Sequence, residues 1–264
     1  MSFLNNNWWL MPLIVTMFTG ILCPAMGTVL ITHKRLLQVN LMSHCVLPGL
    51  ALAIALGIPP SIGGVLSGLV GASIAEGLTN RKSENYEAVM NTILAGMLGF
   101  GVLLIPLLGI RIDLEAVLFG DLLTANLGDL IRNLIAFCMF TSLMIFGYEK
   151  IIYIGLDQEG ASANGINVNL LNILLSFTTA LVIVSSMSAV GVILVIALVS
   201  TPTLLGVSKA SSLSKAMLKS STYGLLISLL GFALSIKFNL SPGPAISLLC
   251  VISLVFLRDK NKYA

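Results

Sequence analysis

The residues best suited to chemistry in this chain are Asn40 and His44, which stand four positions apart at the start of an apolar stretch. On a helix, residues at this spacing share one face and can contact the same ligand. A neutral imidazole nitrogen and an amide oxygen are both acceptable ligands for first-row divalent metal ions. The pair therefore fits a metal site. It also fits a simpler arrangement, in which a histidine near the membrane surface bonds to a neighbouring carbonyl group.

Membrane-spanning helices are the elements expected to position this pair. Of the 264 residues, 57% are hydrophobic and only 9% are charged, whereas soluble domains carry about 25% charged residues. Apolar stretches recur that are long enough to cross a hydrocarbon layer of ~30 Å. Spans in lipid must be helices or a closed barrel, and these stretches do not alternate as barrel strands do. We therefore expect an all-α polytopic membrane protein.

Nine apolar segments divide the chain. The pair at 171–187 and 189–206 is short for two complete crossings at about 1.5 Å per residue. Small and polar residues at 185–191 favour a broken or re-entrant helix there. We therefore expect eight or nine transmembrane helices. The segments are 10–31, 42–57, 61–79, 88–109, 131–148, 171–187, 189–206, 220–236 and 244–257.

Basic residues indicate the orientation of the spans. Only three of the fourteen, Arg111, Arg132 and Lys237, fall on one face, and the other eleven fall in loops on the opposite face. The positive-inside rule makes the richer face cytoplasmic, which places the C-terminus inside. Nine full spans put the N-terminus outside, and eight put it inside. The eleven are Lys34, Arg35, Arg81, Lys82, Lys150, Lys209, Lys215, Lys219, Arg258, Lys260 and Lys262.

Several functions lack support in the sequence. The formal net charge is +3 without a basic cluster, so we expect no nucleic-acid partner. The four cysteines form no CxxC pair that would indicate a zinc or redox motif. No GxxxxGK[ST] segment is present to hold nucleotide phosphates. We expect no catalytic residues and no permanently bound cofactor, so ATP-driven transport would need a separate ATPase.

Two further groups of residues are candidates for function. On the cytoplasmic side, Asp157 and Glu159 precede the small residues Gly160 and Ala161, and acids favour a helix N-terminus. A short helix with such a low surface can seat in a groove of another protein; the alternative is an ordinary connecting loop. Hydroxyl residues within the spans either line an ion pathway or pack between helices. The candidates for lining are Ser43, Ser185, Ser186 and Ser188.

The segment from Asn40 to Gly49 contains the run SHCVLPG. It resembles the D-x-x-S-H-A-V-L-P-G motif of the permeases of metal-ion ABC importers for manganese, zinc and iron. Four other segments resemble motifs of that family in the same order, so the resemblance covers nearly the whole chain. They are 118–123 (LFGxIL), 157–166 (D-x-E-x-A-x-x-x-G-I/V), 189–202 (AVG-xxLV-xALLxxPA) and 241–246 (xSGPAIVL).

The resemblance implies a single permease domain, residues 1–264, in a plasma (inner) membrane of bacterial type. It implies that 157–166 is a cytoplasmic coupling helix docking on an ABC ATPase. Further implied partners are an extracytoplasmic metal-binding solute-binding protein and a second permease copy, identical or related. The implied cargo is a divalent metal ion, Mn²⁺ favoured, with Zn²⁺ and Fe²⁺ as alternatives. The implied site residues are Asn40 and His44 on the ion pathway, and Asp157, Glu159, Gly160, Ala161 and Gly165 at the ATPase.

Asn40 departs from the family motif, which has aspartate at this position. Two facing asparagines leave a divalent charge uncompensated where water is scarce. Three explanations of the asparagine at this position remain. The site binds the ion more weakly with the help of water, another acid substitutes for the aspartate, or the partner is a different permease that retains the aspartate. Glu76 is the candidate for such a replacement acid, because it lies well inside an apolar span. The alternative is an interfacial glutamate near Arg81 and Lys82. Four acids of the opposite face would attract cations, dock a delivery protein or lie in a solvated loop: Asp113, Glu115, Asp121 and Asp129.

Other function classes are less favoured. An ion-coupled secondary transporter needs ionisable groups within the membrane, and the chain offers little beyond His44 and Glu76. An intramembrane metalloenzyme needs a ligand cluster such as HExxH, but His33 and His44, the two histidines, are eleven positions apart. Permeases for vitamins or metal chelates usually have more spans.

Overall fold

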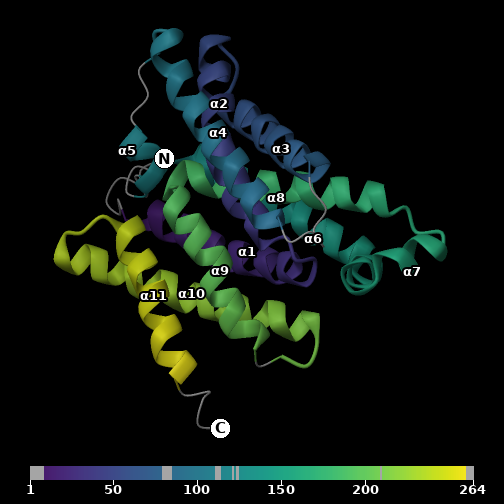
Figure 1. Cartoon of the computed structure of the whole chain (residues 1–264). Coiled ribbons are helices and arrows are strands. Elements are labelled where there is room, and N and C mark those ends of the chain that lie inside the picture. The colour runs from purple at the N-terminus through teal and green to yellow at the C-terminus, as the bar shows by residue number, and fades with distance from the viewer. Residues whose placement is uncertain are drawn as a thin grey trace. The chain divides into compact units, whose positions relative to one another are not determined.

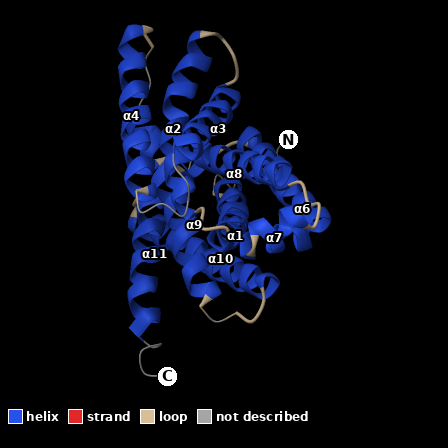
Figure 2. Cartoon of the chain, turned by 45° about the vertical axis from the view of Figure 1, so that its right-hand side comes forward, coloured by secondary structure: helices blue, strands red, loops and turns tan. Residues whose placement is uncertain are grey.

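The computed structural model describes residues 9–78, 85–110, 114–120, 122, 125–208 and 210–259. These residues form helices joined by turns, and no strand occurs among them (Figure 2). The expectation of an all-α protein is confirmed. The helices are α1 (Leu10–Thr32), α2 (Leu36–Ala55), α3 (Pro60–Leu78), α4 (Tyr86–Leu107), α5 (Leu114–Phe119), α6 (Leu127–Leu156), α7 (Gln158–Ala163), α8 (Val168–Val190), α9 (Val192–Val207), α10 (Leu213–Phe238) and α11 (Pro242–Asp259).

Seven of the described helices are long and apolar enough to cross a membrane: α1, α2, α3, α4, α6, α8 and α10. The chain is thus a multi-pass membrane protein, but the expected eight or nine spans exceed this number. The difference arises from α9 and from the apolar part of α11, Pro242–Phe256, which are shorter. With 16 residues, α9 extends about 24 Å, which is less than a hydrocarbon layer of ~30 Å.

The expected interruption between the sixth and seventh apolar segments is present. Helix α8 ends at Val190, Gly191 has a φ of 82°, and α9 begins at Val192. This break lies at the end of the predicted 185–191 stretch. From the sequence, both segments were expected to be short helices, whereas α8 has 23 residues and only α9 is short. The apolar segment is shorter than α8 because the helix includes additional residues, among them polar ones, at its ends.

The helices group into two compact units. The first comprises residues 1–31, 115–140 and 185–264, and the second comprises 32–114 and 141–184. Helices α6 and α8 contribute to both units. That residues 1–264 act as one permease domain stays a prediction.

In the first unit, three segments that resemble family motifs meet through their backbones. A Cβ atom on Gly191 would overlap the backbones of Phe119 and Gly120, and one on Gly243 would overlap the Phe119 carbonyl oxygen. Gly120 in turn lies against the backbone of Val190. Only glycine permits this approach, and Gly120 and Gly191 also have positive φ angles of 69° and 82°.

In the second unit, α2 packs against α3 and α4, which lie beside it in both views (Figures 1 and 2). The backbones of Gly49 and Gly63 touch, so that neither position has room for a side chain. Close approach through small residues is a common way for membrane helices to pack. A buried cluster of Leu41, Cys45, Ala75, Tyr86 and Met90 continues this contact toward the N-terminal end of α2.

Candidate functional site

Helix α2 positions the predicted metal ligands. It follows a tight turn at Lys34, whose φ of 55° is left-handed, and its first helical residue is Leu36. The sequence placed the start of this span at residue 42, so that Asn40 lay outside it. The structure includes Asn40 within the helix, one turn before His44.

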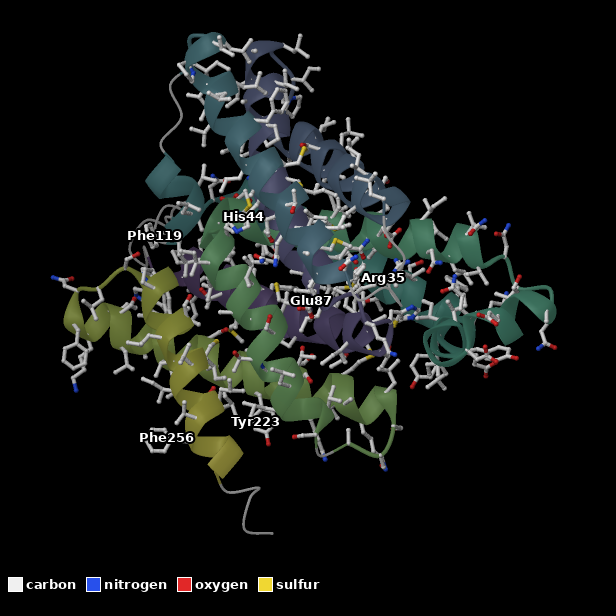
Figure 3. The ribbon with its side chains drawn as sticks, viewed as in Figure 1. Arg35, His44, Glu87, Phe119, Tyr223 and Phe256 are labelled. Carbon is white, nitrogen blue, oxygen red and sulfur yellow. The ribbon has the colours of Figure 1, made fainter. Side chains whose placement is uncertain are left out.

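Asn40 and His44 lie on a different face of α2 from the residues packed inside the protein. Both are half-buried, whereas Leu41 and Cys45 are fully buried against α3 and α4. Figure 3 labels His44. In the described part of the chain, no three His, Cys, Asp or Glu residues are grouped so that they could hold a metal ion. One copy therefore offers an imidazole and an amide on one face, and this pair alone does not make a complete ligand set.

The four serines predicted to line a pathway fall in two places. Ser43, on α2, is buried and donates to the carbonyl of Val39 at 2.8 Å. Ser185, Ser186 and Ser188 lie at the end of α8 in the first unit. Their contacts are those of packed polar groups, and a role in ion passage stays a prediction.

Asn133 organises the polar contacts between α6 and the end of α8. It is fully buried and donates to the carbonyl of Ser185 at 3.1 Å. Its side-chain oxygen accepts from Ser186 at 3.3 Å. Asn133 is not among the residues predicted from the sequence, although a lone amide in an apolar segment is a signal that could have found it.

Asp129 is a buried capping residue at the start of α6. Its carboxylate accepts from the backbone N–H of Asn126 at 3.0 Å, while the Asn126 side chain accepts from the N–H of Asp129 at 3.2 Å. This reciprocal pattern is a capping box. Asp129 also pairs with Arg132 and accepts from Ser188 at 3.1 Å. It is 5% exposed, so it belongs to no solvated loop; Asp113, Asp121 and the side chain of Glu115 lie outside the described residues.

Glu76 is paired within the second unit. Its Oε1 atom lies 3.4 Å from a guanidinium nitrogen of Arg35 and accepts from Gln38 at 2.9 Å. The neighbours expected from the sequence, Arg81 and Lys82, lie outside the described residues. Arg35 was not predicted as a partner, because 41 positions separate it from Glu76 in the chain.

The predicted coupling segment contains a short helix, α7, and its capping is local. Asp157 precedes the helix, and its side chain accepts from the N–H of Gly160 at 2.9 Å. Asn164 follows the helix and donates to the Tyr153 hydroxyl at 2.7 Å. These contacts fix both ends of α7 to its own chain.

The five residues implied at the ATPase differ in exposure. Asp157, Glu159 and Gly165 are exposed, Gly160 is half-buried, and Ala161 is fully buried. Ala161 packs with Ile154 and Val168 in a small core. Ala161 therefore anchors α7 to the chain, and the exposed residues form the surface that another protein could reach.

A cleft of about 1020 Å³ lies beside α7 in the second unit. Residues of α7 and its flanks form one wall, and the end of α3 forms another. The charged and histidine side chains that line it are His33, Lys34, Glu76, Asp157 and Glu159.

Comparison with known proteins decides the family. The model of the ABC 3 transport family matches residues 6–258, almost the full chain. The chain belongs to the ABC 3 transport family. The resemblance drawn from the five motifs is therefore confirmed.

Proteins similar to this chain carry transport names. The chain is 30% identical over 241 residues to the manganese transport system membrane protein MntC of Listeria innocua, covering 91% of this chain and 86% of that one. It is 29% identical to a probable iron transport system membrane protein of Haemophilus influenzae, covering 90% and 88%.

A solved structure has a similar fold. PsaBC from Streptococcus pneumoniae in complex with Fab superposes with a TM-score of 0.84 at 28% identity, covering 97% of this chain and 91% of that chain. The superposition covers nearly the full length of both chains, so the two proteins share this fold.

Proposed function

We propose that this chain is the membrane-spanning permease subunit of an ATP-driven importer for divalent transition-metal ions, with Mn²⁺ as the favoured cargo. The observation that carries the proposal is the Asn40–His44 face of α2 in a chain whose ABC 3 relatives are named as metal transport proteins. Transport rather than catalysis is the role of such a subunit, and ATP hydrolysis belongs to a separate ABC ATPase.

The ion passes between two permease copies in this proposal. One copy contributes an imidazole nitrogen and an amide oxygen, which is fewer ligands than a divalent ion takes. A second copy, identical or related, doubles that number at a shared site. The absence of carboxylate at Asn40 makes binding weaker and water-assisted, which favours rapid release of the ion.

The exposed part of α7 docks on the ATPase. Asp157 and Glu159 present negative charge at the start of a capped helix, and Gly165 leaves a low surface at its end. ATP binding and hydrolysis shift this segment, and the spans alternate between outward-facing and inward-facing states. An extracytoplasmic solute-binding protein delivers the ion on the opposite face. This arrangement places the C-terminus in the cytoplasm of a bacterial-type cell.

Mn²⁺ is the favoured cargo because the proposed ligands are an imidazole and amide oxygens. Such a ligand set suits a harder ion, whereas a cluster of thiolates would suit a softer one. Zn²⁺ and Fe²⁺ are the alternatives, and one relative carries an iron transport name. An ion-coupled secondary transporter is the less favoured rival, because the family is one of ABC transporters.

Metal accumulation tests the proposal. The chain is expressed with its ATPase and solute-binding protein in a bacterial strain deleted for its own manganese importers, and uptake of Mn²⁺, Zn²⁺ and Fe²⁺ is measured. We expect His44→Ala to abolish Mn²⁺ uptake while the complex still assembles. Thr92→Ala is the matched control, because Thr92 is an exposed residue of α4 that donates to its own helix. Normal uptake by assembled His44→Ala, or uptake without any ATPase, would overturn the proposal.

A further inference from the structure

Arg35 is a buried cation immediately before α2 (Figure 3). Its side chain is 0% exposed and is one of the largest fully buried side chains in the described residues. A basic residue that only sets orientation can remain in water at the membrane surface. Burial of a guanidinium group is unfavourable unless it is paired and hydrogen-bonded, so the contacts of Arg35 require an explanation of their own.

One set of contacts joins Arg35 to α8. A guanidinium nitrogen donates to the Ser176 hydroxyl at 3.1 Å and to the Asn172 carbonyl oxygen at 3.4 Å. Ser176 and Asn172 are four positions apart, so one nitrogen reaches two successive turns of α8. The start of α2 is thereby held against α8.

A second set joins the same turn of α2 to α3. The other terminal nitrogen of Arg35 lies 3.4 Å from Glu76 Oε1, and Gln38 donates to that oxygen at 2.9 Å. Gln38 is 1% exposed. One carboxylate oxygen on α3 therefore interacts with two side chains of α2, on either side of its first turn.

The cluster of Arg35, Gln38 and Glu76 lies directly before the proposed ion ligands. Asn40 follows Arg35 by five residues and His44 by nine, which is about 7.5 and 13.5 Å along a helix. Beyond them, the Cys45 carbonyl accepts from Ser67 of α3. The ligand-bearing turns are thus fixed to α3 on both sides, and a rotation of α2 would require breaking the buried cluster.

We propose that Arg35, with Glu76 and Gln38, is a positioning residue that fixes the rotation of α2 and so fixes the direction in which the ligand face of Asn40 and His44 points. This inference rests on the proposed function. It also assigns Glu76, because its carboxylate is engaged by Arg35 and Gln38. Glu76 therefore does not replace the aspartate missing at position 40; it acts on the ion through α2.

Equilibrium binding of Mn²⁺ to the purified permease–ATPase complex tests the inference. Free Mn²⁺ is measured by electron paramagnetic resonance, and each Kd refers to the amount of assembled complex. We expect Arg35→Met to weaken binding about tenfold or more, the range found when residues supporting metal ligands are replaced. Lys34→Met is the control, because it removes an adjacent exposed charge outside the cluster, and it should leave the Kd unchanged.

Two further variants separate positioning from ligation and from folding. Glu76→Gln keeps an oxygen that accepts from both partners but removes the charge that offsets Arg35. It should therefore bind Mn²⁺ more tightly than Arg35→Met, whereas binding would be lost if the Glu76 carboxylate were a ligand of the ion. The double variant Arg35→Met with Glu76→Leu leaves no unpaired buried charge and should assemble. We still expect it to bind Mn²⁺ about tenfold more weakly.

Wild-type affinity in the assembled double variant would overturn the inference, as would a Glu76→Gln variant that has lost binding. His44→Ala, measured in parallel, reports on the proposed function alone. If His44→Ala loses binding and the double variant does not, the site is correct and the positioning role is wrong. If His44→Ala binds normally, the proposed function fails first.

Discussion

The close contact of backbones around Gly191 in the first unit predicts that substitution of this glycine lowers the stability of the protein. Substitution of Gly191 by alanine has two consequences. Its φ of 82° and ψ of 160° place it in a region that essentially only glycine adopts, which costs about 1–3 kcal/mol for another residue. The new Cβ would also overlap the backbones of Phe119 and Gly120, which cannot rotate away as a side chain can.

Two other glycines separate these contributions. Gly109 has a φ of 65° and nothing within 4 Å of its would-be Cβ, so Gly109→Ala adds strain without overlap. Gly243 has no positive φ, but its Cβ would overlap the Phe119 carbonyl oxygen, so Gly243→Ala adds overlap without strain. Strain at Gly109 should cost about 1–2 kcal/mol, and overpacking at Gly243 about 1–3 kcal/mol.

Gly191→Ala combines both effects and should cost about 2–6 kcal/mol, a large part of the ~5–15 kcal/mol that stabilises a typical protein. The measurement is thermal unfolding of the purified complex in one detergent or nanodisc preparation, with yield of assembled complex as a second readout. The expected order of stability is wild type, Gly109→Ala, Gly243→Ala, then Gly191→Ala. If Gly191→Ala were no less stable than Gly109→Ala, the close approach of these backbones would be refuted.

The remaining predictions concern individual contacts. Asn133→Leu removes two interhelical hydrogen bonds, each worth up to about 1.7 kcal/mol in a membrane protein. It should therefore lower the free energy of unfolding by roughly 1–3 kcal/mol, measured by thermal unfolding. No change would argue against the polar contacts at the end of α8. Asn40→Asp should tighten Mn²⁺ binding and slow release, read from Kd and from uptake rate in the same complex; unchanged binding would remove Asn40 from the site. Asp157→Ala deletes a helix cap worth about 1 kcal/mol and should reduce metal-stimulated ATPase activity with basal activity retained, whereas Lys150→Ala, outside the capped segment, should not. A bulky residue at Gly160 would collide with the capping carboxylate and should uncouple the ATPase in the same assay; an unchanged ratio of stimulated to basal activity would contradict docking through α7.

Much of this protein follows from local properties of the sequence. Whether a segment enters a membrane depends on its own length and apolarity, and a segment in lipid must satisfy its backbone polar groups within itself by forming a helix. Accordingly, each of the nine expected segments corresponds to a helix in the structure. The capping of α7 involves Asp157 and Gly160, which are three residues apart. The shared face of Asn40 and His44 follows from helical spacing alone. Each of these features depends on residues within one or two turns of each other.

Only the tertiary structure decided which distant residues meet. The sequence favours Glu76 as an interfacial acid near Arg81 and Lys82 over a replacement ligand, and it does not indicate the contact that forms once α3 packs beside α2, where Arg35 and Gln38 share one Glu76 oxygen. Likewise, the close approach that leaves no room for a Cβ atom at Gly191 comes from the backbone of Phe119, 72 positions away in the chain. Local sequence carries no record of such contacts, because their energy depends on how helices pack, and in lipid that packing is set by shape and by paired polar groups rather than by apolarity.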